Sequence, residues 1–282
     1  MSYNELLQRG TADFPIELYV VDEYDPRYEM VSHWHSEFEI IRIVKGSLNI
    51  QLNNNIYTAY EGDIFFTNPE IIHSAMPTES VYECLVFDIE SLTAGFSGCR
   101  YFFDGLVNGE YLINEYISLS EENIRICVSN IIETMKHKSS GFKFKVVGEL
   151  YKLFGEIVDN HMYTHISGEN SLFTDRNFVK LKGVLRYMRD NYDKQITLDD
   201  MSTAAGMSSK YFCRFFKEMT RKSPVEYLNT YRVEKAARKL ISSDMNVTDI
   251  AYMCGFNDLS YFIKTFKIYK GVTPSKFRTL SI

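Results

Sequence analysis

The amino-acid sequence predicts a multidomain α+β protein, in which an N-terminal β-barrel of the jelly-roll type precedes a helical segment and an all-α domain with two helix-turn-helix units. Three observations predict this class: strand-like runs up to residue 89, helical periodicity from residue 119, and a motif repeated within residues 197–278. The 282 residues, 45% of them hydrophobic, are enough for two cores. The predicted parts are residues 1–100 (barrel), 101–166 (helical segment), 167–175 (linker) and 176–282 (all-α domain).

The N-terminal part contains brief apolar or alternating runs separated by turn residues, a pattern typical of antiparallel strands. One predicted turn is Lys45-Gly46-Ser47, between two such runs. Many evenly spaced strands in so short a segment favour a barrel or jelly roll, whose interior is a natural small-molecule site. The predicted strands are residues 16–20, 38–44, 48–52, 64–67 and 84–87.

Two histidines lie close together in this strand-rich part. Because side chains alternate along a strand, His33 and His35 project from one face and Trp34 from the other, and Glu39 has the parity of the histidines. With a glycine at the next turn, this spacing resembles the first motif of the cupin family. A later stretch that ends at His73 resembles the second cupin motif, although it is one residue short and lacks the closing Asn. The resemblance implies an effector site formed by His33, Trp34, His35, Glu39 and His73.

Three interpretations of the histidines stay open. Three His and one Glu are a suitable set for a divalent transition metal, namely His33, His35, Glu39 and His73. In sensor domains of similar sequence such residues also line a ligand pocket without metal, and they can be ordinary core residues. No cofactor is required. A metal-dependent cupin enzyme or a metal-responsive sensor, fused to the C-terminal all-α domain, is therefore an alternative, and the incomplete second motif disfavours the enzyme.

The segment after the barrel changes to helical periodicity. Ser120-Glu121-Glu122 is a helix-start signal, and apolar residues at spacings of three and four follow it to Met135. A second apolar stripe runs from Val146 to Val158 after a glycine-containing break. These two amphipathic helices could cover the barrel or form a dimer contact, and both interpretations stay open. Residues 167–175 read as the interdomain linker.

The C-terminal part contains the same motif twice. Residues 211–217 read YFCRFFK and residues 261–267 read YFIKTFK, each followed by a Ser-Pro or Thr-Pro pair. Upstream, Gly206 and Gly255 suit the tight turn of a helix-turn-helix unit. Thr197 and Thr248 are the predicted N-caps of the preceding helices, because acidic residues follow them. Each copy therefore predicts helix, glycine turn and second helix.

The second helix of each copy has one apolar face and one polar face. Short hydroxyls and long cations on an exposed helix are suited to base edges and phosphates, whereas the alternative is a simple solvated face. Two matched copies in tandem favour DNA binding. The predicted DNA-binding residues are Ser208, Ser209, Lys210, Cys213, Arg214 and Lys217 in the first copy, and Asn257, Leu259, Ser260, Ile263, Lys264 and Lys267 in the second.

The last hundred residues resemble the AraC/XylS transcriptional regulators. The resemblance rests on the repeated motif, on the connecting helix from Ser223 to Leu240, and on residues 271–278, GVTPSKFR. It implies that Ser209, Lys210, Cys213 and Arg214, with Leu259, Ser260, Ile263 and Lys264, face the bases in successive major grooves, about 34 Å apart. Two departures, Ser202 and Arg221 in place of Ala and Gly, suggest a looser first unit.

The charge of the chain is divided between its halves. Residues 175–282 carry 20 Lys and Arg against 11 Asp and Glu, a balance of +9. Because the whole chain has 31 against 37, the residues before 175 carry −15. The basic part is the part with the repeats, so it supplies salt-dependent attraction to phosphate, and the acidic half is not expected to touch DNA.

Taken together, these features predict a transcriptional regulator and not an enzyme. Five cysteines without a CxxC motif indicate reduced thiols, and no apolar run suggests a membrane span or an export signal, so a cytoplasmic location is expected. By resemblance, the partners are double-stranded promoter DNA, a second copy of the chain, a small-molecule effector such as a carbohydrate, and RNA polymerase if the protein is an activator, which is the expected role.

Overall fold

The computed structural model describes residues 3–4, 9–11, 13–89, 97–166, 176–220 and 222–280. The chain divides into two compact units, Met1–Asn170 and Ser171–Ile282. The predicted linker 167–175 and Arg221 lie outside the described residues. Within the described part of the chain, no helix is both long enough and apolar enough to cross a membrane.

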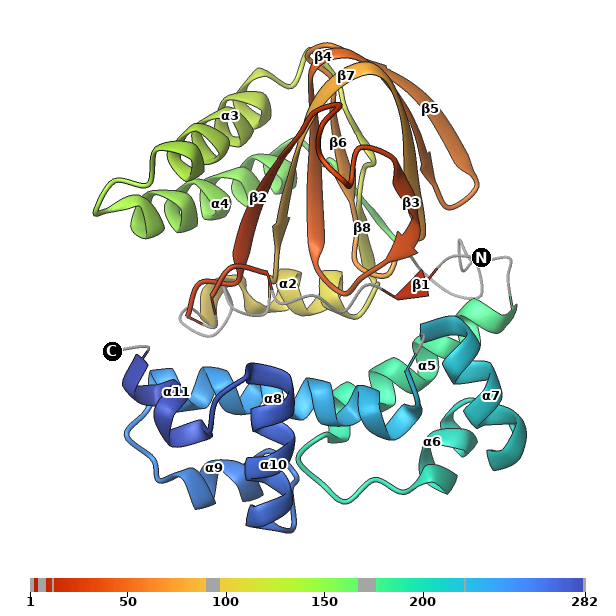
Figure 1. Ribbon diagram of the computed structural model, residues 1–282. Coiled ribbons are helices and arrows are strands. Elements are labelled where there is room, and N and C mark those ends of the chain that lie inside the picture. The colour runs from red at the N-terminus through yellow and green to blue at the C-terminus, as the bar shows by residue number, and fades with distance from the viewer. Residues whose placement is uncertain are drawn as a thin grey trace. The chain divides into compact units, whose positions relative to one another are not determined.

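The first unit is built on an eight-stranded, mostly antiparallel sheet (Figure 1). The two longest strands, β4 and β7, pair along their whole length and form its centre. The C-terminal half of β7 also pairs with β2 and its beginning with β3, whereas β4 pairs first with β6 and then with β5. The strands are β1 (Tyr3–Asn4), β2 (Ile16–Val21), β3 (Met30–Trp34), β4 (Phe38–Leu52), β5 (Asn55–Tyr60), β6 (Ile64–Thr67), β7 (His73–Phe87) and β9 (Tyr116–Ile117).

The predicted turn at residues 45–47 is wrong, because β4 continues through it as one strand. Gly46 has a φ of 75° and lies where the pairing of β4 with β7 shifts register. A Cβ at this position would collide with Glu79 O of β7, so only glycine fits this bulge. The bulge lies between the part of β4 that pairs with β6 and the part that pairs with β5, so it marks the boundary between the two halves of the sheet.

The helical segment shares one core with the sheet. The predicted start near Ser120 is confirmed, since α3 begins at Glu122. Its predicted apolar stripe is buried and packs with sheet residues such as Phe38 and Phe87, so the inner faces of α3 and α4 cover the sheet. The segment is not entirely helical, because β9 joins the sheet and β8 pairs with β10. Its remaining elements are η1 (Ser97–Cys99), α2 (Arg100–Val107), β8 (Tyr111–Ile113), α3 (Glu122–His137), α4 (Phe142–Asp159) and β10 (Tyr163–His165).

The second unit is all-helical in its described residues. The predicted N-cap Thr197 is confirmed: its side chain accepts from Asp200 N, and Asp200 reciprocates at Thr197 N. The predicted N-cap Thr248 is wrong, because the Asn246 side chain accepts from Asp249 N and starts the helix earlier. The helices are α5 (Arg176–Asn191), α6 (Leu198–Ala204), α7 (Ser209–Thr220), α8 (Pro224–Ser242), α9 (Val247–Met253), α10 (Leu259–Lys270) and α11 (Pro274–Leu280).

Helix α8 connects the two helix-turn-helix units, α6–α7 and α9–α10, which lie toward its two ends in Figure 1. The buried Arg232 of α8 donates to Tyr192 O at 2.8 Å and to Lys194 O at 2.7 Å, after the end of α5. The Gly255 turn, between α9 and α10, packs against the same Arg232 and Tyr192. One buried guanidinium therefore holds the turn of the second helix-turn-helix against the segment that leads from α5 into the first helix-turn-helix.

Candidate functional site

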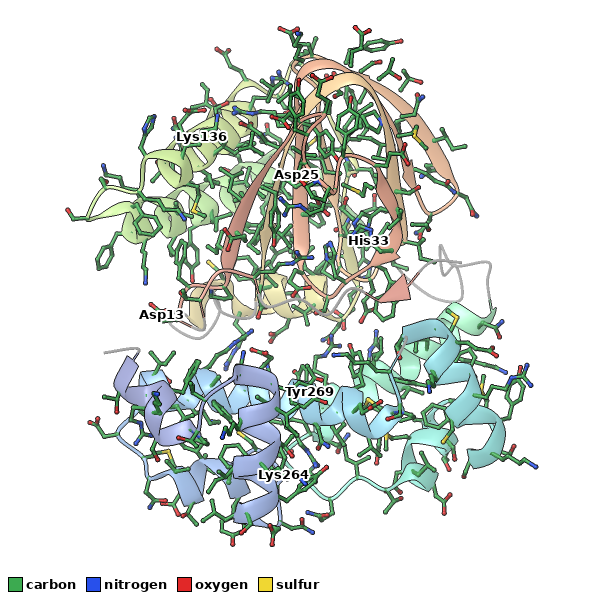
Figure 2. The ribbon with its side chains drawn as sticks, in the orientation of Figure 1. Asp13, Asp25, His33, Lys136, Lys264 and Tyr269 are labelled. Carbon is green, nitrogen blue, oxygen red and sulfur yellow. The ribbon has the colours of Figure 1, made fainter. Side chains whose placement is uncertain are left out.

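The predicted histidine cluster is assembled in the first unit. His33 lies on β3, His35 directly after it, Glu39 near the start of β4 and His73 at the start of β7. One donor atom from each of the four residues lies within 4.8 Å of the others, and the four residues are only 1–7% exposed. Figure 2 shows His33 on β3 within the sheet. Residues 40 positions apart thus meet because β3 pairs with the beginning of β7.

Backbone carbonyls orient all three imidazoles. The Nδ1 atoms of His33 and His73 lie 2.8 Å from Val31 O and Ile71 O, and Nδ1 of His35 lies 3.1 Å from Glu37 O. A carbonyl oxygen can only accept, so each Nδ1 carries a proton. In the neutral imidazole each Nε2 then presents its lone pair, which is the state that ligates a metal.

Glu39 provides the negative charge of the cluster. Its Oε2 forms a hydrogen bond with His35 Nε2 at 3.2 Å and lies 3.1 Å from His73 Nε2, an ion-pair contact without a hydrogen bond. Burial alone would raise the pKa of Glu39, yet contact with the two imidazoles holds that pKa well below its usual value. Burial lowers the pKa of His33 to about 4, with the charge of His73 adding to the effect.

The pKa of His35 changes in the opposite direction. Burial would lower it, but the hydrogen bond and the charge of Glu39 outweigh burial and raise it. Without a metal, the cluster therefore favours a protonated His35 beside an ionised Glu39.

Two neighbours complete the description of the cluster. Trp34 is 1% exposed, but its side chain is not one of the four donors. Cys84, absent from the sequence prediction, is buried on β7 opposite Ile41; burial and then the charge of Glu39 raise the pKa of its thiol. The register of β7 with β4 could have identified it, since Ile41 shares the parity of Glu39. The predicted carbohydrate effector stays a prediction.

The predicted DNA-contacting residues lie on the outer faces of α7 and α10 or directly before these helices. In the first unit Ser208, Lys210, Arg214 and Lys217 are exposed, and Ser209 and Cys213 are half-buried; in the second, Asn257, Ser260, Lys264 and Lys267 are exposed, and Leu259 and Ile263 are half-buried. The opposite faces carry the buried phenylalanines Phe212, Phe215, Phe216, Phe262 and Phe266. Figure 2 labels Lys264 on α10.

Two of these side chains have partners within the first helix-turn-helix, α6–α7. Arg214 Nε donates to Glu218 at 2.9 Å, but both side chains are well exposed, so the pair is weak and easily exchanged for a phosphate or base. Ser209 Oγ donates to Asp199 at 2.6 Å and lies 3.1 Å from Ser202 Oγ. Ser202 is 4% exposed and also donates to Asp199 O, so this departure from the family pattern adds hydrogen bonds between α6 and α7.

Two exposed tyrosines lie outside the predicted set of DNA-contacting residues. Tyr211 and Tyr261 occupy the same position in the two copies and are 59% and 47% exposed, beside the cationic faces. The hydroxyl of Tyr261 accepts from Asn229 of α8 at 2.8 Å. The repeat predicts this position, because both tyrosines precede a buried phenylalanine and therefore lie at the edge of the apolar stripe.

Two family models match the chain. The model of the AraC-like ligand-binding domain matches residues 15–154, and a helix-turn-helix domain model matches residues 201–279. The first range contains the whole histidine cluster, and the second contains α7, α8 and α10.

Similar proteins match nearly the whole chain. The uncharacterised HTH-type transcriptional regulator YdeC of Bacillus subtilis is 26% identical, over 98% of this chain and 96% of its own. The Msm operon regulatory protein of Streptococcus mutans is 22% identical with the same coverage, and the HTH-type transcriptional activator RhaS of Mannheimia succiniciproducens is 23% identical over 92% and 93%.

Solved structures are also similar. The DNA-binding domain of AdpA in complex with a target DNA is 29% identical and covers 36% of this chain and 91% of that one, with a TM-score of 0.35. Apo ToxT of Vibrio cholerae is 17% identical, over 98% and 100%, with a TM-score of 0.39. Both family models and the full-length relatives agree, so the chain belongs to the AraC family and is a DNA-binding transcriptional regulator, not an enzyme, with a ligand-binding domain in its N-terminal half.

Proposed function

We propose that this regulator responds to a divalent transition-metal ion held by His33, His35, Glu39 and His73. The observation that carries the proposal is the convergence of one donor atom from each of three imidazoles and one carboxylate, while a backbone carbonyl lies within 3.1 Å of every Nδ1. Histidine ligands in metal sites typically donate their second nitrogen in this way, which fixes the ring and its tautomer.

The donor set fits such an ion. Imidazole and carboxylate ligands suit zinc, nickel, manganese and iron, and the Glu39 carboxylate offsets part of the ion's charge. His73 Nε2 is buried without a hydrogen-bond partner, which is costly in a folded protein and is resolved when the nitrogen becomes a ligand. Donors that all lie within 4.8 Å suit a single ion, whereas a sugar needs a cavity of hundreds of Å³.

Occupation of the cluster would link β3, β4 and β7. Glu39 belongs to the half of the sheet that packs under α3 and α4, and His33 and His73 to the other half. An ion that binds the linked arrangement more tightly would shift the population toward it and so change the helices on the outer face. This is the proposed route from effector to dimer and promoter.

The test is promoter binding by the full-length protein, measured by fluorescence anisotropy after chelation and after addition of each metal. One metal is expected to change the affinity at least about tenfold. His73→Ala should abolish that response, while His161→Asn, at an exposed histidine outside the cluster, should keep it. An unchanged affinity with every metal, or an intact response in His73→Ala, would exclude the metal as effector.

We also propose that α7 and α10 enter successive major grooves, with Arg214 and Lys264 at base edges. Both side chains are exposed, and α8 couples the two helix-turn-helix units; both observations support this proposal. Lys270 pairs with Glu234 of α8 at 2.7 Å, and the Tyr269 hydroxyl donates to Glu226 O at 3.3 Å. Both contacts hold α10 against α8 and favour a fixed spacing of the two helices.

The proposed homodimer contact is the outer face of α4. Phe144 is 87% exposed, and Gly148, one turn later, has open space around it. A hollow of about 550 Å³ between α3 and α4 is lined by both residues. An antiparallel pairing of two α4 helices would place each Phe144 against the glycine of the other copy, where a close approach is possible.

The proposed outcome is activation in the cytoplasm through contact with RNA polymerase. One similar protein is named a transcriptional activator, which supports this role. Transcription of a promoter fragment in vitro with and without the protein tests it, and reduced transcript would instead indicate a repressor.

A further inference from the structure

A second hollow of the first unit is separate from the histidine cluster. It measures about 560 Å³ and lies between α3 and the sheet, at β4 and the turn from β5 to β6. Part of its wall is apolar, formed by Ile43, Val44, Ile64 and Ile126. Val44 is 40% exposed and Ile126 44% exposed. Its volume falls in the range of small-molecule sites.

Arg125 of α3 lines this hollow with unused binding capacity. Its Nη2 donates to Gly62 O at 2.7 Å, its Nη1 has no hydrogen-bond partner, and it forms no ion pair with any described residue. Arg42 in the same wall differs, because Glu83 neutralises it at 2.6 Å. A half-buried guanidinium always carries its charge, and a carboxylate is its preferred partner.

The same hollow also offers negative charge. Glu122 lies one turn before Arg125 on α3, and Glu61 lies on the facing turn; both are exposed, and neither forms an ion pair with the described residues. A simple anion would meet these two carboxylates as well as the guanidinium. A ligand with both charges satisfies all three groups.

We propose that this hollow binds a zwitterion with an apolar side chain, of the α-amino-acid class. The ligand carboxylate pairs with Arg125, its ammonium group lies at Glu61 or Glu122, and its side chain packs on the isoleucine-rich wall. Such a ligand fastens α3 to the β5–β6 turn, which the Arg125 contact with Gly62 already joins. The site is independent of the proposed metal response and adds a second class of effector.

The test is isothermal titration of the full-length protein with apolar amino acids (leucine, valine, methionine, phenylalanine) and with two singly charged analogues of leucine, 4-methylpentanoate and 3-methylbutylamine. At least one amino acid should bind, and if leucine binds, each analogue should bind at least about tenfold more weakly. Arg125→Gln should weaken amino-acid binding by a similar factor, and Arg100→Gln, an exposed arginine of α2, should not.

A second pair of measurements separates the charges. Glu61→Gln combined with Glu122→Gln should weaken amino-acid binding but not binding of 4-methylpentanoate, whereas Arg125→Gln should weaken both. Unfolding curves and metal titration establish that each variant keeps its fold and its histidine cluster. No binding of any amino acid up to roughly 10 mM, or binding that ignores Arg125→Gln, overturns the proposal without touching the metal response.

Discussion

Glu83 of β7 and Lys136 of α3 form an ion pair of 2.7 Å that joins the sheet to the helical layer, and the same carboxylate accepts from Arg42 Nε at 2.7 Å. Glu83 is 1% exposed, so it would be costly to bury without these two cations. We predict that Glu83→Gln lowers the free energy of unfolding by about 2 kcal/mol, because two charged hydrogen bonds lose their anion. Urea denaturation measures it.

The matched control is Glu133→Gln. Glu133 contacts the same two cations, but its side chain is 51% exposed, and its loss should change the free energy of unfolding by less than about 0.5 kcal/mol. Equal effects of the two substitutions would show that burial of Glu83 does not set its contribution.

Metal removal should destabilise the first unit. At a free metal concentration of 100 times the dissociation constant, binding adds about 2.7 kcal/mol to the free energy of unfolding. Because contact with Glu39 outweighs burial and raises the pKa of His35, the ion displaces a proton there, so the gain should grow as pH rises until it exceeds that raised pKa. Thermal unfolding with and without chelator at several pH values measures it. A metal effect that is flat or falls with pH would contradict the assignment of His35 as a ligand.

The sequence could predict the cluster but not the path of the strands around it. Parity placed His33, His35 and Glu39 on one face, and only pairing of β3 with β7 brings His73 to them. The sequence does not distinguish a turn from a bulge at Gly46, because a glycine between two apolar runs gives the same signal in both. The first half of β7 gives no strand signal, because residues 73–80, HSAMPTES, contain a proline and few apolar side chains.

The helix-turn-helix units were more predictable, because the repeat and the 3.6-residue period are local signals. The start of α9 was not, since Asn246 and Thr248 are both good caps. The choice depends on which oxygen reaches the third amide of the helix, and in the structure that is Asn246 Oδ1 at 2.7 Å from Asp249 N.

The two turn glycines should respond differently to alanine. Both have positive φ, 61° at Gly206 and 80° at Gly255, which costs an alanine about 1–2 kcal/mol. Nothing lies near a Cβ at Gly206, but a Cβ at Gly255 would collide with Tyr192 O and approach the Arg232 guanidinium. Gly255→Ala should therefore lower the free energy of unfolding by about 4 kcal/mol or more. If Gly206→Ala and Gly255→Ala lowered the free energy of unfolding equally in urea denaturation, the Arg232 side chain would move aside without an energetic cost.

Substitutions at Gly148 test whether the outer face of α4 forms the dimer contact. Because the site is open and lies inside a helix, both Gly148→Ala and Gly148→Leu should stabilise α4 by up to about 1 kcal/mol in the monomer. Only leucine fills the hollow that the proposed partner needs, so it should shift the protein toward monomer in sedimentation velocity. A dimer that survives Gly148→Leu would place the contact on another face.

The helices α7 and α10 should contribute unequally to sequence discrimination. The first has three exposed cations, Lys210, Arg214 and Lys217, whereas Ile263 of the second is apolar at a position that faces bases by resemblance. We predict that Arg214→Ala lowers the free energy of specific binding by about 1–3 kcal/mol and relaxes sequence discrimination, since a long cation can read guanine O6 and N7. Lys264→Ala should act more uniformly across sequences, as expected if the second unit mainly anchors the domain.

Anisotropy titrations on operator and scrambled duplexes, at two salt concentrations, separate these roles. Loss of a phosphate contact lowers affinity for both duplexes and reduces the salt dependence, whereas loss of a base contact lowers affinity for the operator alone. Glu218→Gln is the control for Arg214→Ala, because it frees the guanidinium from its 2.9 Å partner without removing it and should not weaken operator binding. If Lys264→Ala disturbed discrimination more than Arg214→Ala, the second unit would be the main reader of the sequence.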